Sequence, residues 1–139
     1  MKLNKIVRNV LAVITGIVLG SVVNMGIIML QNSFIALPEG VDVTNTESLQ
    51  SSMHLFELKH FIFPFLAHAI GTLVGAHLSA RIAASHKMNF ALGIGIFFLI
   101  GGISMAFMMP APIWFIVVDL SLAYIPMSWL GWRLSGKKQ

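Results

Sequence analysis

The stretch VLAVITGIVLGSVVNMGIIML, residues Val10–Leu30, contains no charged residue and decides the class of protein. About 20 consecutive, mostly apolar residues are enough for an α-helix to cross the hydrocarbon core of a bilayer. Three further stretches meet that condition, at residues 61–84, 90–109 and 113–132. We therefore predict an all-α membrane protein, a bundle of four transmembrane helices that forms one integral membrane domain over residues 1–139.

The composition supports this prediction and excludes several other classes of protein. Of the 139 residues, 57% are hydrophobic and 10% are charged, and there is no cysteine. Soluble domains carry roughly 25% charged residues, so this chain has too few to cover its surface in water. The missing cysteines exclude disulfide scaffolds and thiol catalysis. The sequence contains no P-loop, GxSxG, HExxH or dinucleotide-binding motif, and it leaves any cofactor unknown.

The basic residues predict the orientation of the four helices. All except Lys59 fall into three groups, which are Lys2, Lys5 and Arg8 before the first helix, Arg81 and Lys87 around the second connection, and Arg133, Lys137 and Lys138 after the fourth helix. With an even number of spans these groups share one side, and basic residues favour the cytoplasm. We expect both termini to be cytoplasmic, in a plasma or inner membrane. The net charge of +4 is thus an orientation signal and does not indicate a nucleic-acid partner.

The predicted outer loop, residues 31–60, contains a helix signal. Thr44-Asn45-Thr46-Glu47 fits a capping box, in which a Thr hydroxyl and a Glu carboxylate bind first-turn amides. A short interfacial helix is expected to begin near Asn45 and to run to about Leu58. It either lies along the outer membrane surface or packs on the bundle as a surface helix.

Small residues recur every four positions in two of the predicted helices. The first helix has Ala12, Gly16 and Gly20, and the second has Ala67, Gly71, Gly75, Ser79 and Ala83. Helices in lipid associate largely by close packing through small residues. We predict a close seam between these two helices; a flexible gate or a dimer contact is the alternative.

Four polar residues lie at a common depth in the predicted bundle, and they are Asn24, His68, Ser104 and Asp119. At about 1.5 Å per residue, each lies roughly 8–10 Å below the outer boundary. We predict that the four line one ligand-binding pocket open to the outside.

His68 is the predicted partner of Asp119. A lone carboxylate at this depth is costly unless it is protonated, paired or hydrated. A His–Asp couple can relay protons, bind a cation or orient a ligand amine. The alternative is a structural pair that only fastens the second helix to the fourth.

A second candidate site is a metal site in the outer loop. His54, Glu57 and His60 recur every three residues, and two histidines with a carboxylate suit Zn²⁺. However, His54 and His60 lie about 120° apart around a helix, so the three side chains converge poorly. A polar rim at the membrane surface is the alternative interpretation.

Three functions remain open from the sequence. The first is a small carrier or permeation protein for a small polar or cationic solute, or for protons. Four helices enclose little space, so we expect a homo-oligomer. The second is a non-catalytic accessory or structural subunit of a larger membrane complex. The third is an intramembrane enzyme that acts on a lipid or quinone, with His68 and Asp119 as the acid–base couple.

Overall fold

The computed structural model describes residues 3–136, and within them every regular element is a helix. The elements are α1 (Lys5–Phe34), α2 (Thr46–Ser52), the 3₁₀ turns η1 (Met53–Leu55) and η2 (Leu58–Phe61), α3 (Ile62–Ile82), α4 (Lys87–Met108), α5 (Ile113–Leu122) and α6 (Ile125–Leu134). They form four helical stretches that are long and apolar enough to cross a membrane, with η2 continuing into α3 and α5 into α6. The chain thus has the four long apolar helices that the sequence predicts.

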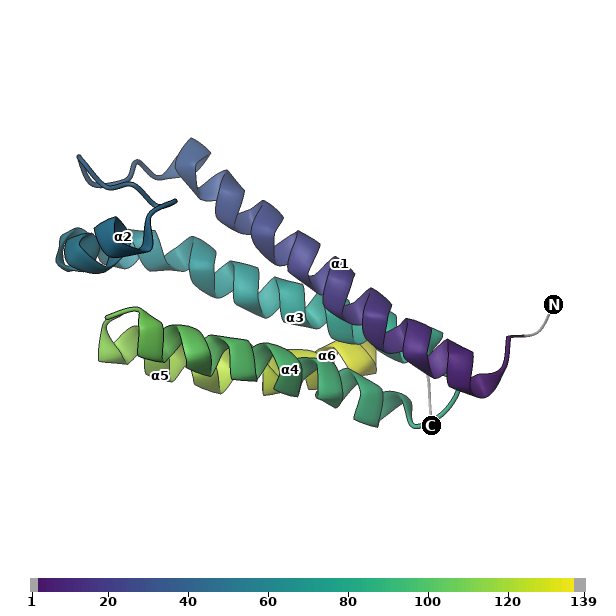
Figure 1. Ribbon diagram of the computed structural model, residues 1–139. Coiled ribbons are helices and arrows are strands. Elements are labelled where there is room, and N and C mark those ends of the chain that lie inside the picture. Colours follow the sequence, from purple (N-terminus) through teal and green to yellow (C-terminus); the bar gives the residue numbers. More distant parts are fainter. Residues whose placement is uncertain (1–2, 137–139) are drawn as a thin grey trace.

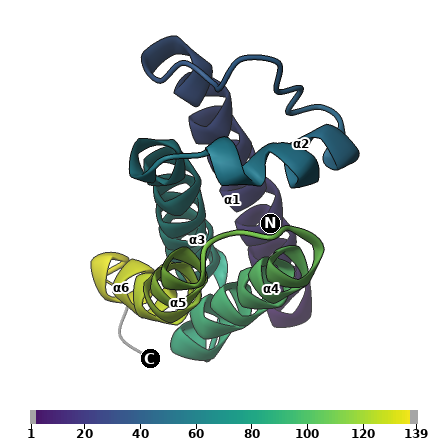
Figure 2. The same ribbon diagram turned by 90° about the vertical axis from the view of Figure 1, so that its left-hand side faces the viewer.

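The long helices form a bundle in which α1 diverges from the rest at one end. Figure 1 shows that α1 lies close to α3 near its beginning and moves away from α4 and α5 toward its own C-terminal end. At that end α2 crosses over the helices, as the view along the bundle shows (Figure 2). The beginning of α1 and the end of α6 lie together at the opposite end (Figure 1), as an even number of long helices requires.

The predicted seam between α1 and α3 is confirmed by the approach of their backbones. A Cβ atom added to Gly16 would lie 2.8 Å from the carbonyl oxygen of Gly75, and one added to Gly20 would lie 2.8 Å from the carbonyl oxygen of Gly71. Real Cβ atoms do not come so close to a carbonyl oxygen. The two helices can therefore cross at this distance only because four glycines meet at the seam.

Two differences from the predicted segments bear on the position of the site. The first helix runs from Lys5 to Phe34, so the predicted loop at 31–60 begins only at residue 35. The buried Gln31 is part of the last turn of α1 and donates through Nε2 to the carbonyl of His60. Because its side chain is bonded in this way, the polar Gln31 can extend the helix beyond residue 30, where the apolar stretch of sequence ends.

The second difference is a break in the fourth helix, between α5 and α6. Pro126 lies in the first turn of α6 and has no N–H to donate to the residue four positions earlier. Ala123 and Tyr124 at the break are buried, with 0% and 2% of their surfaces exposed. The break is thus enclosed by protein, which is the setting in which an apolar helix bundle tolerates irregular backbone.

The predicted helix in the loop is present but shorter than expected. Its cap is Asn45, whose side chain accepts hydrogen bonds from the amides of Glu47 and Ser48. Thr44, predicted to cap, instead binds Asp42 through its hydroxyl and its amide, and these bonds lower the pKa of Asp42. α2 therefore begins at Thr46 and ends at Ser52.

Basic side chains fasten the end of the bundle opposite α2. Arg8 donates to the carbonyl of Ile82 at 2.9 and 3.2 Å, and Arg81 donates to the carbonyl of Ser135 at 3.1 Å. These carbonyls lie at helix C-termini, where cations are favoured. Lys2, Lys137 and Lys138 lie outside the described residues.

We predict that Gly20→Leu destabilises the protein by at least about 1–3 kcal/mol, the usual cost of overpacking. The added side chain would meet the Gly71 carbonyl and the Phe98 ring. The matched control is Gly26→Leu in the same helix, because a Cβ atom there has nothing within 4 Å. Equilibrium unfolding in mixed micelles measures both variants. Equal losses of stability would contradict the assignment of the seam.

Candidate functional site

A chain of three hydrogen-bonded side chains joins α3 to the broken fourth helix. His68 Nδ1, on α3, lies 2.8 Å from Asp119 Oδ1 on α5. The Tyr124 hydroxyl, at the break, donates to Asp119 Oδ2 at 3.1 Å. The rings of His68 and Tyr124 stack with their centroids 5.7 Å apart. Both carboxylate oxygens are thus bound by side chains that come from different segments.

Asp119 is buried, and His68 is the ionisable side chain that is bonded to it. Only 4% of the residue is exposed, and an unpaired charge in such a place is strongly unfavourable. With His68, the carboxyl group can form a pair without net charge, either as imidazolium and carboxylate or as imidazole and carboxylic acid. Each of these neutral forms carries one proton more than the negatively charged pair of imidazole and carboxylate.

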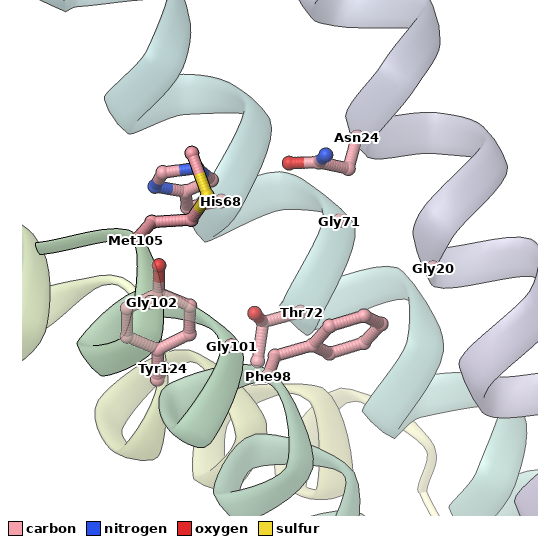
Figure 3. Close-up of a pocket in the computed structure, with 10 residues that line it drawn as sticks. All are labelled: Gly20, Asn24, His68, Gly71, Thr72, Phe98, Gly101, Gly102, Met105 and Tyr124. Atoms are coloured by element: carbon pink, nitrogen blue, oxygen red, sulfur yellow. The ribbon is translucent and has the colours of Figure 1, made fainter. Parts of the chain in front are cut away.

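A cavity of about 200 Å³ lies beside this pair, between α1, α3 and α4. It is lined by Gly20, Asn24, His68, Gly71, Thr72, Phe98, Gly101, Gly102, Met105 and Tyr124. Figure 3 shows the Asn24 side chain pointing from α1 toward the side on which His68 and Tyr124 lie. Asn24, His68, Thr72 and Tyr124 supply the polar side chains of the cavity, and the remainder of its wall is apolar or glycine.

His68 can act on a ligand through its second ring nitrogen. Nδ1 is held by Asp119, while the side chain is 24% exposed and lines the cavity. Within residues 3–136, Nε2 has no hydrogen-bond partner. A ring held at Nδ1 in this way can accept a hydrogen bond from a ligand at Nε2, or donate one when it is protonated.

The structure brings together three of the four residues predicted for the pocket. Asn24 and His68 line the cavity, and Asp119 lies behind His68 as its partner. Ser104 is exposed, its hydroxyl bonds to the carbonyl of Ile100 in its own helix, and it does not line the cavity. Ser104, which was chosen for its expected depth, therefore takes no part in the cavity.

Two polar residues of the cavity were not among the predicted ones. In a regular helix, Tyr124 would lie about 140° from Asp119, and only the break at Ala123 and Tyr124 lets its hydroxyl reach the carboxylate. Thr72 follows His68 by four residues, so it shares a helix face with His68. That spacing was a usable signal for Thr72, whereas no local pattern indicated Tyr124.

The predicted metal site in the loop is not formed. Among residues 3–136, no group of three or more His, Cys, Asp or Glu side chains is placed to hold an ion. His60 accepts a bond from the Glu57 amide at Nδ1, and its Nε2 lies 3.0 Å from the Ala36 carbonyl. Glu57 pairs with Lys59 at the surface at 3.3 Å. His60 therefore fastens the loop, and His54 does not converge with it.

The comparisons with known proteins found no match, whether with protein-family models, with curated proteins or with solved structures. The arguments about function therefore come from the site itself.

We predict that Tyr124→Phe lowers stability by about 1–2 kcal/mol, because it leaves one oxygen of a buried carboxylate without its donor. His68→Ala should cost more, about 3–5 kcal/mol, since Asp119 would then be buried without a partner for its charge. Equilibrium unfolding of each variant measures these effects.

The control for both is Ser104→Ala, which removes only a bond within α4 on an exposed face and should change stability by less than about 0.5 kcal/mol. Three equal losses would show that the cluster contributes nothing particular to the fold.

Proposed function

We propose that the protein is a multi-pass integral membrane carrier that exchanges a small cation bearing N–H groups for a proton. The cation binds in the cavity beside His68, and the proton is the one held by the His68–Asp119 pair. The observation that carries this proposal is the buried Asp119 carboxyl group, bonded to His68 at the wall of a cavity.

The outer surface of the helices supports a place in the membrane. Large apolar side chains are exposed on every long helix, among them Val22, Phe97, Phe107 and Val117. A soluble monomer does not usually present apolar surface on this scale to water. We place both termini in the cytoplasm and the cavity in the outer half of the bilayer, on the distribution of basic residues described above.

The need for charge balance supports exchange of one cation for one proton. A cation that enters an apolar environment requires a negative partner. In this proposal the His68–Asp119 pair has a net negative charge only after it has lost its proton. The pair therefore releases one H⁺ to water as one ligand ammonium group enters, and the site remains neutral in both states. Neutral His68 then accepts an N–H bond from the ligand at Nε2.

The broken fourth helix is a second support. Transporters commonly place their binding sites at helices interrupted within the membrane, where unwound backbone lines a cavity. Here the break provides Tyr124, which lines the cavity and binds Asp119. Since a single bundle of four long helices encloses little space, we also propose that the carrier works as a homo-oligomer.

Guanidinium is a suitable probe because it stays charged at neutral pH and carries several N–H donors. Proteoliposomes loaded with guanidinium and diluted into guanidinium-free buffer should acidify inside, as guanidinium leaves and protons enter. An internal pH dye records the rate. We expect His68→Ala and Asp119→Asn to abolish the acidification.

The matched control is His77→Ala, which changes another histidine of α3 that does not line the cavity and should keep the activity of the unmodified protein. A rate equal to that of empty liposomes would contradict the carrier. If the unmodified protein also copurifies with a fixed partner, that result would favour the accessory-subunit alternative.

A further inference from the structure

Thr72 is a buried polar residue of the cavity whose hydroxyl is unused. The residue is 1% exposed, and within residues 3–136 its Oγ1 has no hydrogen-bond partner. A threonine inside a helix commonly donates to the carbonyl four residues before it, which here is that of His68, and Thr72 does not do so. A buried hydroxyl without a partner is unfavourable, so a ligand that offers Thr72 a hydrogen bond would be favoured at this position.

Thr72 and His68 are two anchors on one face of α3. Residues four apart on a helix have Cβ atoms about 5–6 Å apart, and both side chains line the same cavity. Figure 3 shows Thr72 beside Phe98 and apart from Met105. A ligand that reaches both anchors therefore carries two polar groups separated by a short apolar link.

We infer that the ligand is an amino alcohol, in which a primary ammonium group and an oxygen are separated by two or three carbons. This inference rests on the proposed cation site and identifies its ligand class. The ammonium N–H donates to His68 Nε2, and the oxygen exchanges a hydrogen bond with Thr72. The carbon link packs against Phe98 and Met105, and a flexible Met side chain can move to admit it.

The same two anchors discriminate against other small cations, which bind to them less well. A quaternary ammonium compound has no N–H to donate to His68 Nε2. A simple alkylamine binds His68 but leaves Thr72 without a partner, which is the situation that binding sites for hydroxyl groups discriminate against. Thr72 is therefore the residue that determines specificity, whereas His68 determines whether a cation binds at all.

The test compares ethanolamine with ethylamine, which differ by the hydroxyl group. Isothermal titration of the protein in phosphatidylcholine nanodiscs should show ethanolamine binding about fivefold to tenfold more tightly than ethylamine, the value of one net hydrogen bond. Thr72→Val, which keeps the shape and removes the hydroxyl, should abolish this ratio without weakening ethylamine. Thr72→Ser should restore it, and Ser104→Ala should leave it unchanged.

Two results overturn the inference in different ways. If both amines bind equally to the unmodified protein and to Thr72→Val, and His68→Ala removes both, the hydroxyl preference is wrong while the cation site stands. If neither amine binds nor releases a proton, the cation site and the inference both fail.

The headgroup of phosphatidylethanolamine has the same arrangement of ammonium and oxygen, so a second pair of titrations separates the two sources. In nanodiscs that contain this lipid, a headgroup that is the ligand competes with free ethanolamine. The unmodified protein then binds free ethanolamine more weakly than it does in phosphatidylcholine nanodiscs, whereas Thr72→Val shows no such change. An unchanged affinity identifies the free amino alcohol. Both results retain the amino-alcohol class.

Discussion

The cost of burying the carboxylate of Asp119 is the constraint on which the site depends. Only 4% of Asp119 is exposed, so its oxygens must be bound and its charge balanced from within the bundle. His68 reaches it from α3, and Tyr124 reaches it from the break that follows α5. One ionisable residue thus fixes the position of α3 relative to α5 and gives the interruption of the fourth helix a structural role.

The helix crossing at the glycine seam determines where the cavity beside this cluster lies. Gly16 and Gly20 hold α1 against Gly75 and Gly71 of α3 at backbone contact. Beyond the seam α1 diverges from α4 (Figure 1), and the cavity lies between these two helices and α3. The close packing of α1 at the seam and its separation from α4 toward its C-terminal end therefore come from the same helix crossing.

The geometry of regular helices explains which residues of the site could be predicted from the sequence and which could not. Position along a helix depends only on residue number, and Asn24, His68 and Asp119, which were chosen for a common expected depth, lie close together in the structure. Direction around the axis depends on which neighbours each helix meets, and for that reason Ser104 is exposed and does not line the cavity. The metal prediction failed because His54, Glu57 and His60 do not lie on one regular helix: η1 ends at Leu55 and η2 begins at Leu58.

The sequence by itself determined that the chain forms four long apolar helices, that glycines bring the first two together, and that a buried acid needs a partner. These properties depend on hydropathy, on residue size and on the cost of charge in an apolar medium, which are local. Only the tertiary structure decided that Tyr124 completes the pair and that Thr72 is left without a partner in a cavity. Both depend on how the break near Pro126 and the divergence of α1 place these side chains against the other helices, and that placement is set by packing between segments far apart in the sequence.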